Sequence, residues 1–591
     1  MIRRRLSRLP ESTNALLSVA AVIGRHFDLD LLARAAGVDD DAVLDLVEMA
    51  LVSGLVVESE EVVGRFGFSH ALVRETLYEG LSAIRRARVH ARVGEGLECL
   101  PRPADDAAHA IDLAHHFWQA VPVLGAARAL PHVLRGAGVA EALFDYHLAE
   151  RLARAAIDMG GGFPARLVLG KALVGQRRGD EAEELLSSLG ADSATDTERA
   201  LVALTRAPNL IFNLGRPDDA DAVLQEAHED IGDASSREEL TLLRAEFFMW
   251  TNKHGEALEI VGPFVDREDI SDRGLLRAIN AAVANMLVIG RIEECLAQCD
   301  RGLEVARQLV GELPFAEPWL TTVKCTALCD SGRITEGAIL AEHQYQGALQ
   351  ARRYSAAASL AIPYVRGATF RGRMRTAQLR SAEVVPLLRK HEALAYLPFV
   401  LGYLAHAAVL LGDLAAADVA IAQAQEVGTM MMHRHVILRG QAWISAARGE
   451  TSTAQALALE GAESAREVGT NTIEATLLHE AVRLGAAAAV MDRLAEVATS
   501  VDGRLIPTYA AHARAVVNED GVALDTVAAA FAEMGAMLLA AEAAAEAAAC
   551  HRRAGLAGPA EASLCRARAL AALCEGAVSP ALAALNQGSA R

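Results

Sequence analysis

The chain has 591 residues, and its formal net charge of −19 argues against a general binder of nucleic acid or anionic membranes. Aromatic residues make up only 4 %, and much of the 52 % hydrophobic content is alanine, so the composition favours helices over strands. Eight cysteines without a disulfide-framework spacing suit a reducing compartment, and no apolar signal core follows Met1, so we expect a cytoplasmic protein.

Residues 1–100 are predicted to form a small winged-helix domain. Apolar patterns indicate helices over 16–23, 28–36 and 39–53, followed by two short runs, 55–57 and 65–68, that are typical of a β-hairpin. The helix at 39–53 occupies the place of a DNA-recognition helix but carries five carboxylates and neither Lys nor Arg. Phosphates would repel it, so we expect this arm to dock on protein, with DNA binding as the alternative.

Glycine-centred turns recur through the rest of the chain at intervals of 34 to 42 residues. Such a period fits two helices and two turns, with glycine in the left-handed conformation that ends the first helix. The glycines are Gly179, Gly215, Gly255, Gly290, Gly332, Gly372, Gly412, Gly449, Gly485, Gly521 and Gly555. Since a helix hairpin cannot bury its apolar face alone, stacked hairpins are predicted to form a superhelix with a concave binding surface.

The predicted fold is therefore all-α, a tetratricopeptide-like α-solenoid superhelix preceded by the winged-helix domain. We assign residues 101–577 to the helical-repeat domain and residues 578–591 to a disordered C-terminal tail. The stretch 393–412 has no Asp, Glu, Lys or Arg, which is long enough to span a bilayer, but Pro398, Gly402 and the repeat register favour buried helices. We therefore expect no membrane partner.

Five passages resemble a known family, the large ATP-binding LuxR-type transcriptional regulators of actinobacteria, which belong to the STAND class of signalling NTPases. The passages are Arg5–Pro10 (RLSRLP), Ala20–Gly24, Phe66–Tyr78 (FGFSHALVRETLY), Ala541–Gly555 and Ala571–Gly576. The resemblance implies a winged-helix arm and a tetratricopeptide-like sensor. In the family an NTPase module precedes these parts and a DNA-binding domain follows them.

Neither flanking module is expected in this chain. The nearest match to a phosphate loop, residues 367–374, lacks the lysine and the hydroxyl that hold phosphate and Mg²⁺, so we expect no cofactor. Our first hypothesis is a non-catalytic regulatory sensor or scaffold that binds a protein or small effector on its concave face and is read by a separate NTPase or DNA-binding subunit. The alternatives are a DNA-binding regulator that acts through the winged helix and an ATP-binding STAND fragment.

Two sets of residues are candidates for binding and for transmission. A basic cluster could hold an anion or an acidic partner surface, although a solvated face is the simpler interpretation. It comprises Arg352, Arg353, Arg366, Arg371, Arg373 and Arg375. The family resemblance implies that His70, Arg74 and Tyr78 form a hinge between the arm and the array.

Four cysteines form two pairs with a spacing of four residues, Cys295 with Cys299 and Cys325 with Cys329. Each pair lies on one helix face, and two such pairs on neighbouring helices could bind zinc. Because free cysteine is usually buried as a small apolar side chain, we expect these four to pack in the core, and we expect no metal.

Overall fold

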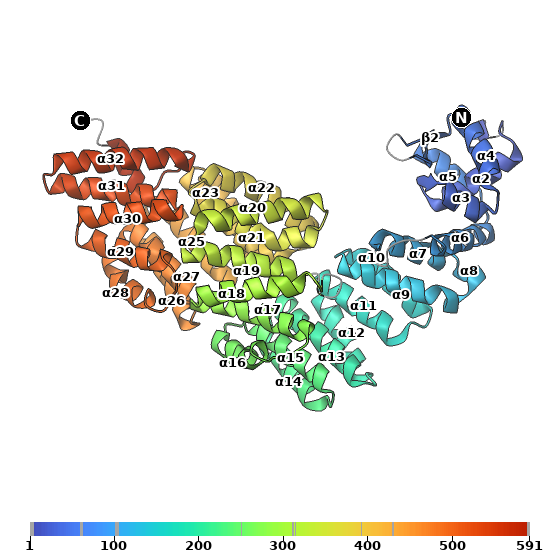
Figure 1. The fold of residues 1–591 in the computed structure, drawn as a ribbon, viewed down its shortest axis with the longest axis horizontal. Coiled ribbons are helices and arrows are strands. Elements are labelled where there is room, and N and C mark those ends of the chain that lie inside the picture. The colour runs from blue at the N-terminus through green and yellow to red at the C-terminus, as the bar shows by residue number, and fades with distance from the viewer. Residues whose placement is uncertain are drawn as a thin grey trace. The chain divides into compact units, whose positions relative to one another are not determined.

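The computed structural model describes residues 5–587 except 7, 60–62, 101–105, 250, 310–312, 314, 392 and 428–430. The chain divides into two compact units, Met1–Glu198 and Arg199–Arg591, each coloured by residue number in Figure 1. The boundary predicted after residue 100 lies inside the first unit, because α6 (Ala83–Glu98) packs on both α3 (Leu29–Ala36) and α7 (Ala107–Gln119).

The arm of the first unit is a winged helix, as predicted. Besides α3 and α6, its helices are α2 (Glu11–Ile23), α4 (Asp40–Val52) and α5 (Ala71–Glu79). Its strands are β1 (His26–Asp28), β2 (Val56–Glu58) and β3 (Arg65–Phe68). The antiparallel sheet has the order β1-β3-β2, so β1 adds a third strand to the predicted hairpin. Three phenylalanines from β1 and β3 pack together beneath this sheet, with the Phe27 and Phe66 rings 6.2 Å apart.

Helix hairpins continue the first unit after the arm. They are α7, α8 (Val121–Leu124), α9 (Ala126–Ala142), α10 (Tyr146–Asp158), α11 (Gly162–Gly175) and α12 (Gly179–Ala191). Each of the longer helices packs against the next along the chain. Their buried residues are mostly Ala and Leu, whose small or flexible side chains allow close helix contacts.

The second unit is a tetratricopeptide-like α-solenoid, which confirms the predicted fold class. Its helices are α13 (Asp196–Pro208), α14 (Pro217–Asp230), α15 (Ala234–Phe248), α16 (His254–Val265), α17 (Asp272–Ile289), α18 (Ile292–Ala306), α19 (Ala316–Ser331), α20 (Ile334–Gln350), α21 (Tyr354–Phe370), α22 (Met374–Lys390), α23 (Leu397–Leu410), α24 (Leu414–Val427), α25 (Met431–Ala447), α26 (Thr451–Glu467), α27 (Asn471–Ala481), α28 (Ala487–Val497), α29 (Leu505–Val517), α30 (Gly521–Met534), α31 (Met537–Arg553), α32 (Ala557–Ala571) and α33 (Pro580–Gln587). Short π or 3₁₀ segments are η1 (Asn209–Asn213), η2 (Leu394–Tyr396), η3 (Val482–Ala486) and η4 (Ala572–Cys574).

Most of the predicted turn glycines take positive φ, among them Gly332 at 98°. The prediction is wrong for Gly179, Gly255 and Gly521, which lie inside the first turn of a helix. At these turns Arg177, Asn252 and Glu519, two or three residues earlier, take φ between 51° and 61°. The left-handed residue is required by the chain reversal, whereas its identity as glycine is not fixed by the repeat.

The array of the second unit folds back on itself, so that α27 contacts α17 and α29 contacts α19. The last carbonyl groups of helices α17, α19 and α23 have no partner within their own helices. Three of them accept hydrogen bonds from the later repeats, with Asn471 Nδ2 2.9 Å from the Ile289 oxygen, Arg504 N 2.8 Å from the Ser331 oxygen and Val578 N 2.7 Å from the Leu410 oxygen. We call this line of contacts the seam.

The seam is tight enough to require glycine at residue 503. A Cβ atom on Gly503 would lie 2.6 Å from the Cα atom of Ser331, and φ is +91° at this residue. One hydrophobic core joins both sides of the seam, running from Leu242 to Leu582. The concave surface that the sequence predicts for binding is therefore covered by later repeats along this part of the array.

The last described residues of the chain are helical. The prediction of a disordered tail over 578–591 is wrong for Pro580–Gln587, which form α33 and bury Leu582, while residues 588–591 lie outside the described residues.

The uncharged stretch 393–412 forms η2 and the buried helix α23, as predicted. Within the parts of the chain that are described, no helix has both the length and the apolar character needed to cross a membrane.

Candidate functional site

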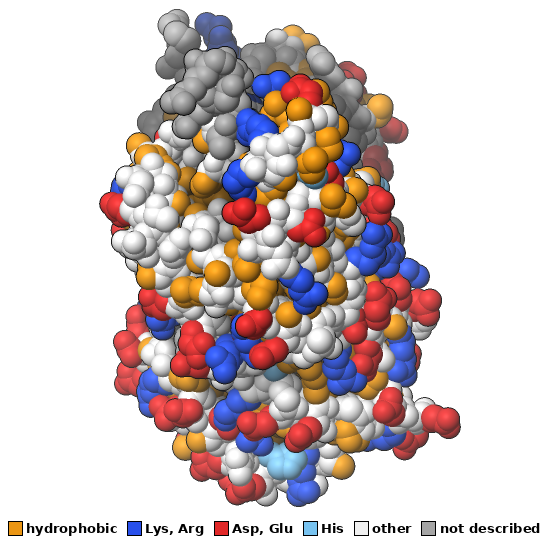
Figure 2. Space-filling model, turned by 90° about the vertical axis from the view of Figure 1, so that its left-hand side faces the viewer, with side chains coloured by type: hydrophobic (Ala, Val, Ile, Leu, Met, Phe, Trp, Pro, Cys, Tyr) orange, Lys and Arg blue, Asp and Glu red, His pale blue; other side chains and the backbone are white. Residues whose placement is uncertain are grey.

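The structure separates the predicted basic cluster into parts. Arg352 and Arg353 precede α21, whereas Arg371, Arg373 and Arg375 follow its C-terminal end. A helix of 17 residues is about 25 Å long. The six arginines therefore do not form one site. On the face shown in Figure 2, basic and acidic side chains are interspersed and do not gather in a single basic patch.

Arg366 points into the array, where its charge is already matched. Its guanidinium donates to the Asp330 carboxylate and, at 3.3 Å, to the Thr326 carbonyl, and it lies 4.3 Å from the centre of the Phe370 ring. Only 8 % of the residue is exposed. Arg366 is therefore part of the interior rather than of an anion site.

The N-terminus of α22, beside the remaining arginines, already holds a carboxylate. Glu575 accepts hydrogen bonds from the Thr376 backbone N–H at 2.8 Å and from its hydroxyl at 2.7 Å. A helix N-terminus favours negative charge, and Glu575 takes the place that a bound anion would have there. Anion binding by Arg371, Arg373 and Arg375 stays a prediction.

A buried ion network fills the interior of the second unit behind the seam. Arg483 donates to Glu542 at 2.8 and 2.9 Å and to Glu480 at 2.7 Å, and Arg439 lies 2.6 Å from the other oxygen of Glu480. Trp443 donates its indole N–H to Glu480 at 3.0 Å. Two arginines and two carboxylates balance, so the network is neutral and every charge in it has an opposite charge beside it.

The space left beside this network is small. A cavity of about 30 Å³ lies among residues from both sides of the seam, including Phe370, His406 and Tyr509. That volume holds one or two water molecules. Among the residues that the structure describes here, this cavity is too small for an effector, and the ion network beside it holds the array together.

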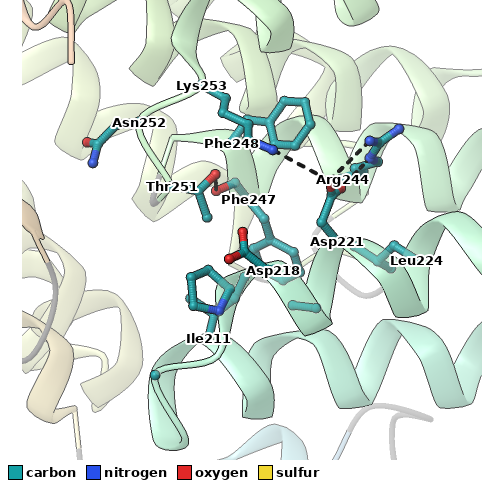
Figure 3. Close-up of a pocket in the computed structure, with 13 residues that line it drawn as sticks. Ile211, Asp218, Asp221, Leu224, Arg244, Phe247, Phe248, Thr251, Asn252 and Lys253 are labelled. Atoms are coloured by element: carbon teal, nitrogen blue, oxygen red, sulfur yellow. Dashed lines mark hydrogen bonds and ion pairs between the residues drawn. The ribbon is translucent and has the colours of Figure 1, made fainter. Parts of the chain in front are cut away.

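A larger cavity of about 300 Å³ opens between α14, the end of α15 and the turn that leads into α16 (Figure 3). Its volume lies at the lower end of the range for small-molecule sites. Apolar side chains of Ile211, Leu224 and Phe247 line one part of it, and charged side chains line another. Ile211 belongs to the π-helical segment η1, a geometry that is frequent at functional sites.

Three charged groups meet around one aromatic ring at this cavity. The Asp221 carboxylate accepts hydrogen bonds from Arg244 and lies 3.5 Å from the Lys253 ammonium. Both cations lie over the Phe248 ring, 5.3 and 5.1 Å from its centre. Burial alone would raise the pKa of Asp221, but the hydrogen bond and charge of Arg244, together with Lys253, lower it. Asp221 is therefore ionised, and the three groups carry one net positive charge.

A second carboxylate lies one helical turn away. Asp218 and Asp221 are three residues apart on α14, so their side chains are neighbours on one face of the helix. Figure 3 shows Asp218 beside Thr251 and Phe247. Among the residues that the structure describes, Asp218 has no hydrogen-bond or ion-pair partner. The cavity thus combines an apolar wall with adjacent groups of opposite charge.

The predicted hinge residues take different places in the first unit. Tyr78 Oη lies 3.2 Å from His90 Nε2 on α6, and His90 Nδ1 lies 2.9 Å from His116 Nδ1 on α7. Arg74 donates to the Ala21 carbonyl of α2 at 3.0 Å, so it holds the arm together internally. His70 is exposed at the start of α5. Tyr78 thus contacts α6 and is linked to α7 through His90, while a hinge role for all three residues stays a prediction.

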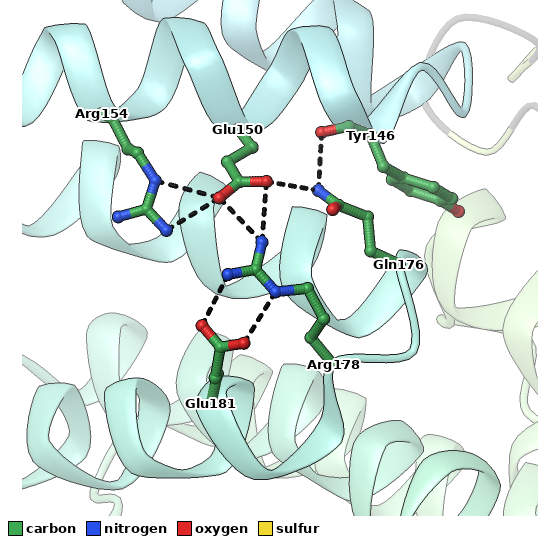
Figure 4. A network of polar contacts seen from close by, with 6 residues as sticks. All are labelled: Tyr146, Glu150, Arg154, Gln176, Arg178 and Glu181. Carbon is green, nitrogen blue, oxygen red and sulfur yellow. Dashed lines mark hydrogen bonds and ion pairs between the residues drawn. The ribbon is translucent and has the colours of Figure 1, made fainter.

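A second polar network joins repeats of the first unit at their turns (Figure 4). Glu150 on α10 accepts hydrogen bonds from Arg154, from Gln176 at 2.8 Å and from Arg178 at 2.9 Å, and Arg178 also binds Glu181 on α12. Burial would raise the pKa of Glu150, but these hydrogen bonds and the charge of Arg178 lower it to about 2. The network fixes the turn between α11 and α12 against α10.

The four spaced cysteines are buried, and Cys295, Cys299 and Cys329 belong to the core of the second unit, as predicted. Burial raises the pKa of Cys329 to about 12, which disfavours the thiolate that zinc requires. Over the described part of the chain, no group of three or more His, Cys, Asp or Glu side chains is placed to hold a metal ion.

No family model and no curated protein matches the sequence. Solved structures with similar arrangements include a STAND protein with a tetratricopeptide repeat sensor from Pyrococcus horikoshii, which is 15 % identical with a TM-score of 0.39. The match covers 71 % of this chain and 63 % of the Pyrococcus horikoshii chain, so this chain spans less than two thirds of the length of that protein.

Two further solved structures have smaller TM-scores. The APC/C hetero-tetramer Cut9–Hcn1 is 13 % identical over 83 % of this chain and 98 % of that one, with a TM-score of 0.28. Naa15/Naa10 bound to HypK-THB is 13 % identical over 94 % and 90 % of the two chains, with a TM-score of 0.25. These likenesses carry neither function nor partner over to this chain.

Proposed function

We propose that the chain is a non-catalytic, cytoplasmic sensor or scaffold of a signalling or transcriptional regulator, and that its helical array binds a small effector or a short protein segment. The observation that carries this proposal is the cavity between α14 and α16, which has both the volume and the mixed lining of a ligand site. The interior behind the seam is filled by side chains of the chain itself, which favours the cavity between α14 and α16 as the ligand site.

Binding at this cavity has a direct route to the rest of the array. Phe247 and Leu224 line the cavity and also pack in the small core of the repeats on either side of it. A ligand that contacts them can change the packing of one repeat on the next, and a separate NTPase or DNA-binding subunit would read that change.

The experiment is a thermal-shift screen of the full chain against nucleotides, sugars, amino acids and short peptides. A compound that binds only the folded state raises the melting temperature by mass action. We expect this shift to disappear in Thr251→Trp, where the indole enters the cavity, and to persist in Gln225→Trp, an exposed residue of α14 outside the cavity. If every stabilising compound acts equally on both variants, the proposal is wrong.

A further inference from the structure

The charges at the cavity between α14 and α16 are arranged for a particular kind of ligand. Asp221, Arg244 and Lys253 together carry one positive charge, and Asp218, one turn earlier on the same helix face, carries one negative charge. The charges that line the cavity therefore sum to zero, with both carboxylates on α14 and the cations on α15 and the turn before α16.

We propose that this cavity binds a small zwitterion with an apolar side chain, namely a free amino acid or a dipeptide. This inference rests on the proposed function and gives it a chemical class. The ligand carboxylate binds Lys253 and the outer edge of Arg244, and its ammonium binds Asp218. An α-amino acid carries its two charged groups on one carbon atom, and a dipeptide carries them one peptide unit further apart. Either ligand can therefore bridge Asp218 on α14 and the two cations that line the same cavity, Arg244 of α15 and Lys253 of the following turn.

Lys253 has the capacity to receive the carboxylate. Its ammonium has three donors, and its ion-pair partner within the described residues is Asp221 at 3.5 Å. The Lys253 side chain is 38 % exposed and the Arg244 side chain 31 %, so both can be reached from the opening of the cavity. The Phe248 ring holds the two cations in place, which leaves less side-chain entropy to be lost when a ligand binds.

The apolar wall receives the ligand side chain. Ile211 and Leu224 are buried within the repeats and present apolar surface to the cavity beside Phe247. A purely anionic ligand such as a nucleotide would meet the carboxylates of Asp218 and Asp221, and a purely cationic ligand would meet Arg244 and Lys253. A neutral sugar would leave the charged groups without compensation for their lost water.

Isothermal titration calorimetry of the full chain with L-leucine and L-leucyl-L-leucine tests this assignment. We expect at least one of the two to bind, and we expect its N-acetyl form, which lacks the ammonium, and its C-terminal amide, which lacks the carboxylate, each to bind at least about tenfold more weakly. If neither compound binds, or if a blocked form binds as tightly as its parent, the zwitterion assignment is wrong.

Three variants locate the two contacts. Asp218→Asn and Lys253→Met should each weaken binding at least about tenfold, because each removes one charged hydrogen bond. Asp219→Asn is the matched control, since Asp219 is exposed, pairs with Arg216 at 2.5 Å and does not line the cavity. Equal affinities in all three variants overturn the assignment. A different compound class whose stabilisation is lost in Thr251→Trp would overturn it too, but would leave the proposed function standing.

Discussion

Replacing Arg483 by methionine removes the centre of the ion network inside the second unit. The guanidinium makes three short hydrogen bonds, two to Glu542 and one to Glu480, and lies 4.5 Å from the centre of the Trp443 ring. The side chains of Arg483, Glu480 and Glu542 are only 3–4 % exposed, so bulk water has little access to the carboxylates that lose these donors. In Arg483→Met, Glu542 loses the cation with which the structure pairs it.

Removing one partner of a buried ion pair costs about 3–5 kcal/mol of unfolding free energy, because the other charge stays buried. We expect this loss in Arg483→Met. The double variant Arg483→Met/Glu542→Leu removes both charges and fills the space with apolar atoms, while Arg439 still pairs with Glu480. Its cost should be no more than about 1–2 kcal/mol.

Urea unfolding of the full chain, followed by far-ultraviolet circular dichroism, measures both free energies. The control is Arg448→Met, which breaks the ion pair with Asp418 at 2.7 Å, where both side chains are 44–45 % exposed. An exposed pair contributes at most about 1 kcal/mol. If Arg483→Met costs no more than Arg448→Met, or if the double variant is no more stable than Arg483→Met alone, the ion network does not stabilise the second unit in this way.

Glu150→Gln should lower the melting temperature near neutral pH, because the fold lowers the pKa of Glu150 from 4.5 to about 2 and so favours its charged form. The difference in melting temperature from the unchanged chain should vanish as pH falls from 4.5 towards 2. A difference that stays constant over that range would contradict this prediction. Burial lowers the pKa of His116 from 6.5 to about 2, so as pH falls this residue is protonated in the unfolded chain before it is protonated in the folded chain. The folded state loses stability as a result, and His116→Gln should reduce this loss between pH 6.5 and 2 in the same titration. Gly503→Ala should destabilise the second unit in urea more than Gly412→Ala, because both have positive φ but only Gly503 has backbone atoms within 3 Å of the new Cβ; equal losses would show that the seam tolerates the side chain.

The repeat architecture could be predicted because its signals are local. Glycine near each reversal and an apolar face on each helix mark the hairpins without any knowledge of distant contacts. The same local signals misplaced the left-handed residue at three turns, where Arg177, Asn252 and Glu519 take that conformation two or three residues before the glycine. The short strand β1 was missed because its three residues pair with β3, which is distant in sequence.

The seam and the cavity could not be predicted from the sequence. The seam depends on the superhelical pitch, which brings Asn471 to Ile289 across 182 residues, and a pattern of one repeat contains no such information. The division of the basic cluster has the opposite cause, since arginines close in sequence lie at the two ends of α21, and anion binding by those that follow α21 stays a prediction. Phe247-Phe248 and Lys253 lie close together in the sequence, but their relation to Asp218 and Asp221 arises only when α14 and α15 pack.

The binding claim is tested most directly by hydrogen–deuterium exchange of the full chain, with and without the compound that raises its melting temperature most. We predict slower exchange in the peptides that cover residues 209–224 and 244–253, because the residues that line the cavity between α14 and α16 belong to these stretches. Slower exchange around residues 371–376, or in the winged-helix arm, with no change at 209–224 and 244–253, would contradict the proposed site.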